Sequence, residues 1–133
     1  MTSPPAAPSS NLPVTADVVV VGAGLAGYCA ALEAAACGAQ VVLLEKQPHA
    51  GGSTVLSGGF MAFAGTPLQL AAGLQDSNEL LLQDLRVVGG PEADQDLLAV
   101  YVREQRGLYD WLTSLGVRFV SLEHSAGQSV ARS

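Results

Sequence analysis

The chain has 133 residues, of which 49% are hydrophobic and 14% are charged. This composition is typical of a globular domain with a core, and it excludes a chain that is mostly disordered. Twelve acidic residues against six basic ones give a formal net charge of −6, which argues against nucleic acid or an anionic membrane surface as a partner. No apolar run reaches the roughly 18 to 20 residues that a spanning helix needs, so we expect no membrane span.

Residues 1–15 are rich in Pro, Ser and Ala, and they lack both the basic start and the apolar stretch of a signal peptide. We expect a disordered tail here, followed by one globular portion at residues 16–133. Without a secretion signal, the sequence predicts a cytoplasmic protein.

Residues 17–45 read DVVVVGAGLAGYCAALEAAACGAQVVLLE. The two apolar runs, Val18–Val21 and Val41–Leu44, predict strands, and the alanine-rich stretch between them predicts a helix. Both runs are continuously apolar, which is typical of strands buried on both faces of a parallel sheet. The sequence therefore predicts an α/β fold that starts with a βαβ unit.

The turn between the first strand and the helix carries Gly22, Gly24 and Gly27 in the spacing G-x-G-x-x-G. In a dinucleotide-binding unit the first glycine allows the tight turn, the second lets the backbone approach a pyrophosphate, and the third lets the helix pack closely. The pyrophosphate then lies at the helix N-terminus, where free N–H groups favour an anion. The candidate residues of this Rossmann-like turn are Gly22, Ala23, Gly24, Leu25, Ala26 and Gly27.

The second strand ends on an acid, Glu45, at about the 20-residue step expected of a ribose-binding carboxylate. The alternatives are a glycine turn that is purely structural and an acid that is merely solvated, but all the flanking features fit a dinucleotide site. On this interpretation Glu45→Ala removes bonds to ribose and leaves the phosphate-binding turn intact.

A glycine- and hydroxyl-rich segment follows, in place of the further helix and strand expected of a nicotinamide domain. Its backbone N–H groups and hydroxyls suit a pyrophosphate or a polar ring edge, whereas the alternative is a flexible surface loop. Long loops inside compact domains are usually functional. The candidate residues are Gly51, Gly52, Ser53, Thr54, Ser57, Gly58 and Gly59.

The βαβ stretch followed by GGSTVLSGG resembles the flavoproteins of the fumarate reductase and succinate dehydrogenase superfamily. The resemblance is closest to the branch of soluble fumarate reductases, tricarballylate dehydrogenases and 3-ketosteroid dehydrogenases, and it covers residues 15–133. It implies that the helix N-terminus holds the FAD pyrophosphate, that Glu45 and Lys46 lie at the ribose, and that the glycine-rich segment follows the pyrophosphate and the flavin. In covalently flavinylated relatives a histidine follows this segment. Because residues 53–65 contain none, the FAD is expected to be non-covalent.

Two helices and a third strand are predicted beyond the glycine-rich segment. Asp76 and Glu79 have capping-box spacing at the start of a helix over residues 77–88. Pro91 is expected to open the next helix, and Gly107 to divide it. Residues 117–122 predict a short strand, and Tyr109 and Trp111 are interpreted as core residues rather than as a ligand-stacking pair.

No residue is predicted to be catalytic and no metal site is expected, because His49 and His124 are isolated. Arg132 is the one candidate for a further polar contact near the cofactor.

The sequence therefore predicts the N-terminal, incomplete part of an FAD-binding domain from a larger oxidoreductase that moves hydride between FAD and an activated C–C bond of a small molecule. The residues indicate neither the substrate nor the electron partner. Two alternatives stay open: the nicotinamide-binding half of an NAD-dependent dehydrogenase, and a truncated product without activity of its own.

Overall fold

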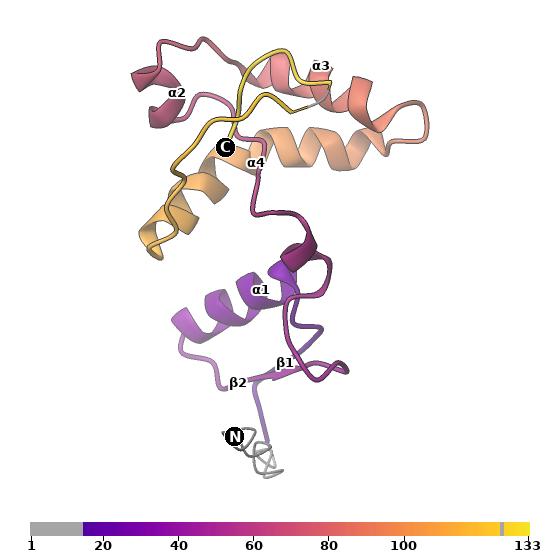
Figure 1. The fold of residues 1–133 in the computed structure, drawn as a ribbon. Helices are drawn as coiled ribbons and strands as arrows, with labels where there is room; N and C mark the ends of the chain where they lie inside the picture. Colours follow the sequence, from indigo (N-terminus) through magenta and orange to yellow (C-terminus); the bar gives the residue numbers. More distant parts are fainter. Residues whose placement is uncertain (1–14, 126) are drawn as a thin grey trace, which may run out of the picture. The chain divides into compact units, whose positions relative to one another are not determined.

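The computed structural model describes residues 15–125 and 127–133, so the predicted disordered tail lies almost wholly outside the described residues. The chain divides into two compact units, Met1–Gly59 and Phe60–Ser133. The elements, labelled in Figure 1 where there is room, are β1 Val18–Val21, α1 Leu25–Ala36, β2 Val41–Leu44, the 3-10 helix η1 Gly52–Leu56, α2 Pro67–Ala71, α3 Asn78–Gly89 and α4 Gln95–Ser114.

The first unit is the predicted βαβ unit. Strands β1 and β2 pair in parallel, with Val18 opposite Val41 and Val21 opposite Leu44. Helix α1 connects them and packs against both. At the start of the strand pair the Asp17 carboxylate accepts a hydrogen bond from the Gln40 N–H at 2.8 Å. The α/β fold and the bounds of both strands are confirmed.

The strands are not buried on both faces, contrary to the prediction. Val19 is 56% exposed and Val21 is 82% exposed, whereas Val18 and Val20 are half-buried. Side chains alternate between the two faces of a strand. Within the described residues this sheet has two strands and α1 packs against it, so every second residue of β1 remains exposed.

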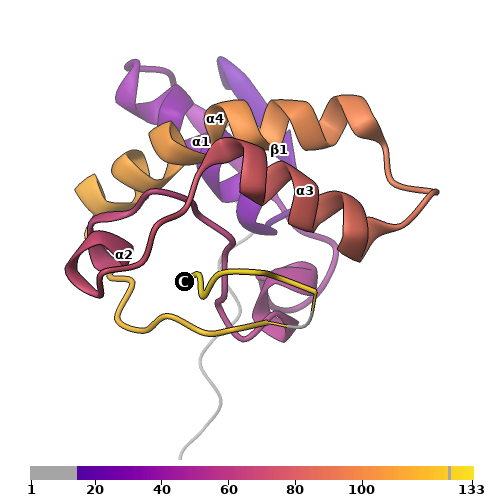
Figure 2. The ribbon, with the colours of Figure 1, turned by 90° about the horizontal axis from the view of Figure 1, so that it is seen from above.

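The core of the second unit lies where α3 and α4 pack side by side (Figures 1 and 2). Leu81 and Val102 from these helices bury Ala64 between them. Farther along α4, Tyr109 packs edge-on against Phe63, with ring centroids 5.4 Å apart. Trp111 is partly buried against the same cluster, which confirms core packing for this aromatic pair.

Three predictions about helix ends are wrong. Ser77 is the N-cap of α3 and accepts a bond from the Leu80 N–H, because Asp76 is engaged elsewhere. Helix α4 begins at Gln95, capped by Asp94, rather than at Pro91, and it continues through Gly107 to Ser114. The packed residues on both sides of Gly107 hold this helix together.

The predicted strand at residues 117–122 is also wrong. Among the described residues this segment has no strand partner, and the one bridge nearby joins Glu123 to Arg132. Phe119 instead stacks on Tyr109 at 5.1 Å between ring centroids. An apolar segment needs a neighbouring strand to form a ladder, and here it covers an aromatic cluster instead. In the described part of the chain no helix is long and apolar enough to cross a membrane.

Candidate dinucleotide site

The glycine turn, residues 22–27, joins β1 to α1 and lies at the carboxyl end of the strand pair. Gly22 has φ +100°, which favours glycine, and its N–H donates to the Leu44 carbonyl at 2.7 Å. A Cβ on Gly27 would lie 1.8 Å from the Gly22 carbonyl oxygen. The first and third glycines of the motif are therefore in direct contact, and the third must lack a side chain.

The Glu45 carboxylate binds this turn. Its Oε2 accepts the N–H of Ala23 at 2.8 Å, and its Oε1 accepts the N–H of Gln47 at 2.8 Å. These two bonds hold the pKa of Glu45 below its ordinary value of 4.5, the bond from Ala23 contributing most. Ala23 is only 2% exposed, although it stands in a loop. This contact links the acid at the end of β2 to the motif at the end of β1.

The glycine-rich loop, residues 51–59, folds onto the same turn. The Gly51 N–H donates to the Ala23 carbonyl at 2.7 Å, and Gly52 lies against Gly24, whose Cα is 3.8 Å from a Cβ built on Gly52. The Thr54 hydroxyl accepts the Leu25 N–H at 3.2 Å. Two segments about 29 residues apart thus form one surface, and the loop is anchored to the turn at Gly51 and Thr54.

The N-terminus of α1 is suited to an anion. Leu25 and Ala26 are the first two helical residues, so their N–H groups have no carbonyl partner within the helix. The N-cap Gly24 supplies no side-chain cap, and the first turn holds no acidic residue. With the macrodipole, this end favours negative charge.

The structure gathers only part of the predicted set. The glycine turn, Glu45, Gly51, Gly52 and Thr54 lie together. Ser57 bonds within the glycine-rich loop: its hydroxyl donates to the Thr54 carbonyl and accepts the Gly59 N–H. The remaining candidates are exposed in the structure, namely Lys46, Ser53, Gly58 and Gly59.

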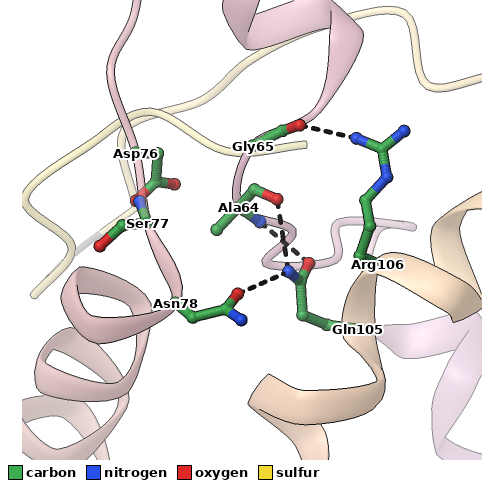
Figure 3. Close-up of a pocket in the computed structure, with 7 residues that line it drawn as sticks. All are labelled: Ala64, Gly65, Asp76, Ser77, Asn78, Gln105 and Arg106. Carbon is green, nitrogen blue, oxygen red and sulfur yellow. Dashed lines mark hydrogen bonds between the residues drawn. The ribbon is translucent and has the colours of Figure 1, made fainter.

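The second unit holds a pocket of about 350 Å³, and most of the residues that line it have polar side chains (Figure 3). Its groups bond to one another: Gln105 donates to Asn78 and to the Ala64 carbonyl, and Arg106 donates to the Gly65 carbonyl. These bonds tie α4 to the start of α3 and to the segment before α2. The polar groups of this pocket are thus used to hold the fold.

Arg132 has a structural role that the sequence did not predict. Its guanidinium is 1% exposed, forms a two-bond contact with Asp76 at 2.8 and 2.9 Å, and donates to Asp84 at 2.6 Å. Burial raises the pKa of Asp84, but the Ser129 N–H and the Arg132 guanidinium outweigh it and lower that pKa. Arg132 is thus committed to two carboxylates, and it is not available as the predicted cofactor contact. Sequence reasoning missed this cluster because Arg132 is 56 residues from Asp76 and 48 residues from Asp84.

Comparison with known proteins places residues 17–132 in the family described as FAD binding domain. Urocanate reductase from Eggerthella lenta is 45% identical to the chain over 131 residues, which are 97% of this chain and 22% of that protein. The cytochrome-type fumarate reductase of Shewanella frigidimarina is 39% identical, over 89% of this chain and 21% of that protein.

Solved structures agree. The open conformation of a flavocytochrome c3 fumarate reductase superposes with a TM-score of 0.80 at 37% identity, covering 88% of this chain and 21% of that one. A 3-ketosteroid-Δ4-(5α)-dehydrogenase from Rhodococcus jostii gives a TM-score of 0.72 at 40% identity, over 85% of this chain and 24% of that one. The chain spans about a fifth of the length of these relatives. It belongs to the family of FAD-binding domains found in flavoprotein reductases and dehydrogenases.

Proposed function

We propose that the chain binds FAD at the surface formed by the glycine turn, Glu45 and the glycine-rich loop. The observation that carries this proposal is the closure of the 51–59 loop onto the turn, through Gly51 and Thr54, beside the N-terminus of α1, whose own N-cap Gly24 supplies no side chain. A glycine turn alone occurs in many folds, but here the glycine-rich loop adds further hydrogen-bond donors for a diphosphate.

The residues of the site fit the parts of the cofactor. The N–H groups of Ala26 and Gly27 in the first turn of α1 bind the diphosphate. The Leu25 N–H already donates to the Thr54 hydroxyl, and that hydroxyl still has its proton to donate to a phosphate oxygen. Each Glu45 oxygen accepts one backbone N–H and keeps a second lone pair for a ribose hydroxyl. FAD, once bound, supplies the hydride chemistry.

The chain serves as the flavin-binding portion of an oxidoreductase that moves hydride between FAD and an activated C–C bond of a small molecule. Its relatives are named as urocanate reductase, fumarate reductase and 3-ketosteroid dehydrogenase, which supports a C–C bond beside a carboxylate or a ketone. The chain spans about a fifth of their length, and the groups that select and protonate the substrate belong to the remainder of such a longer protein. The cytoplasmic location stays a prediction.

FAD is preferred over a nicotinamide cofactor for two reasons. The family match is to FAD-binding domains, and the loop after Glu45 contacts the turn where a nicotinamide domain continues into another helix. Titration calorimetry of the chain with FAD and with NADH tests this choice. We expect FAD to bind and NADH to bind far more weakly. A folded chain that binds NADH and ignores FAD contradicts the proposal.

The same flavin-loaded protein tests the mode of attachment. Acid precipitation is expected to release all of the yellow colour into the supernatant, because residues 53–65 offer no histidine for a covalent link. Colour that stays with the pellet contradicts non-covalent binding.

A further inference from the structure

We propose that Glu45 is a positioning residue for the diphosphate part of the site, in addition to its role at the ribose. This inference rests on the proposed function, and it revises the expectation that Glu45→Ala leaves the phosphate-binding turn intact. The Oε2–Ala23 contact of 2.8 Å ties the carboxylate directly to the backbone of the turn.

Ala23 is the point where three segments meet. Its N–H is bound by Glu45 after β2, and its carbonyl is bound by the Gly51 N–H of the glycine-rich loop at 2.7 Å. Its neighbour Gly22 donates to the Leu44 carbonyl. These backbone bonds of Gly22 and Ala23 therefore depend on groups held by β2 or by the loop.

Removal of the carboxylate leaves the Ala23 N–H without its acceptor at a position that is 2% exposed. A buried donor without a partner is costly, so the peptide unit must turn toward water. Turning the Gly22–Ala23 peptide unit changes the φ angle of Ala23. It therefore also shifts the adjoining Ala23–Gly24 peptide unit, whose Ala23 carbonyl accepts the Gly51 N–H that closes the loop over the turn. The loop then loses its register with Gly24 and with the helix N-terminus.

The charge of Glu45 does not argue against this role. Its oxygens already accept two N–H groups, and these bonds lower its pKa by favouring the charged form. The carboxylate lies on the β2 side of the turn. The N-terminus of α1, where Gly24 supplies no side-chain cap, is the part of the turn that remains available to a phosphate.

A ligand without ribose hydroxyls separates the two roles. The chain and its Glu45→Ala and Glu45→Gln variants are titrated with ADP and with 2′,3′-dideoxy-ADP. If Glu45 positions the turn, Glu45→Ala lowers the affinity for dideoxy-ADP by about tenfold or more, because the buried Ala23 N–H loses its partner. Glu45→Gln restores most of that affinity, because its amide oxygen accepts the Ala23 N–H. Unchanged dideoxy-ADP binding in Glu45→Ala, with weakened ADP binding, overturns the inference.

Asp17→Ala is the matched control. The Asp17 carboxylate also accepts one backbone N–H across the strand pair at 2.8 Å, but at the opposite end of the strands. This variant is expected to lose stability without losing affinity for dideoxy-ADP. A loss of affinity equal to that of Glu45→Ala means that the effect is general to the sheet, and it overturns a specific role for Glu45.

Hydrogen exchange in the ligand-free chain supplies a second readout. Glu45→Ala is expected to speed exchange at the amides of both Ala23 and Gly51, while far-UV circular dichroism stays unchanged. Faster exchange at Ala23 alone shows that the loop does not depend on Glu45, which contradicts the inference. If the unaltered chain binds neither FAD nor ADP, the proposed function itself fails, whatever the variants do.

Discussion

Two glycines of the turn, Gly24 and Gly27, differ in what surrounds them. Gly27 faces the backbone of the turn itself, because a Cβ there would lie 1.8 Å from the Gly22 carbonyl oxygen. Gly24 has an ordinary φ of −83°, and the nearest atom to a built Cβ is the Gly51 carbonyl oxygen at 3.9 Å. The fold therefore requires Gly27, whereas it tolerates a Cβ at position 24, where we expect the proposed ligand to require glycine.

Alanine at these two positions should separate stability from binding. Gly27→Ala is expected to lower the free energy of unfolding by about 3 kcal/mol or more, at the upper end of overpacking costs, since a backbone atom must move. Gly24→Ala should change it by less than about 1 kcal/mol. Gly24→Val should keep the fold and lose FAD, because its branches occupy the phosphate side. Urea unfolding and FAD titration measure both effects, and equal destabilisation by the two alanines contradicts the assignment.

The pH dependence of the turn follows from Glu45. Its pKa is below the ordinary value of 4.5 because the N–H groups of Ala23 and Gln47 favour the carboxylate. Its contribution to the stability of the turn is therefore fully present above pH 4.5 and is lost as the pH falls through the lowered pKa. We expect the Ala23 amide chemical shift to follow that titration and to stay flat in Glu45→Gln. A midpoint above the ordinary value contradicts the contact.

At the scale of elements, the ion cluster of Arg132, Asp76 and Asp84 connects the C-terminal segment to α3 and to the segment just before it. Asp76 precedes α3, Asp84 lies on it, and Arg132 comes from the segment at residues 127–133, which runs beside α3 (Figures 1 and 2). Gln69 from α2 donates to both Asp76 and the Ala131 carbonyl. One guanidinium thus organises three separate parts of the second unit.

Removal of that guanidinium should be costly. Arg132→Ala leaves two buried carboxylates without a cation, for which we expect a loss of about 3–5 kcal/mol in unfolding free energy. Arg132→Lys should retain only part of this unfolding free energy, because an ammonium group cannot reproduce the two-bond contact with Asp76. The control is Arg103→Ala, whose exposed pair with Glu104 should contribute less than about 1 kcal/mol. Similar urea midpoints for Arg132→Ala and Arg103→Ala contradict the role of the cluster.

Gly107 offers a stabilising substitution in α4. It lies inside a continuous helix, and a built Cβ has no heavy atom within 4 Å. Gly107→Ala is expected to raise the unfolding free energy by about 0.5–1 kcal/mol. Gly90 is a matched control, since its built Cβ is equally free but its φ is +65°, so Gly90→Ala should destabilise. A thermal midpoint that falls in Gly107→Ala contradicts a continuous helix.

The sequence pattern predicted correctly those elements that depend only on residues close by in the chain. The bounds of β1 and β2 follow from short apolar runs that begin after a polar residue and end at Gly22 and at Glu45, and the structure reproduces them. The strand at residues 117–122 needed a partner that the sequence could not supply, and the cap of α3 moved to Ser77 because Asp76 binds Arg132, 56 residues away. The glycine positions of the site could be predicted in the same local way. The Glu45–Ala23 bond could not, because it depends on where two strands end relative to each other.

At the scale of the whole molecule, the candidate ligand site lies in the first unit alone. All the contacts among the glycine turn, Glu45 and Thr54 lie within Met1–Gly59. The helices α3 and α4, with their own apolar core and ion cluster, lie within Phe60–Ser133. A ligand that contacts only the first unit has no direct means to stabilise the second.

ADP should therefore protect one unit and leave the other unchanged. At a free concentration of about 100 times its Kd, ADP stabilises the state that it binds by roughly 2.7 kcal/mol. We expect hydrogen exchange at Ala23 and Gly51 to slow by up to about a hundredfold, with no change at Leu81 and Val102, which lie in the core of the second unit. Equal slowing at Leu81 and Val102 would mean that both units open in one cooperative step, because protection then reports the free energy of that shared opening. The ligand-free exchange rates distinguish the two cases in advance, since separate units are expected to give two different opening free energies, and a single cooperative unit gives one.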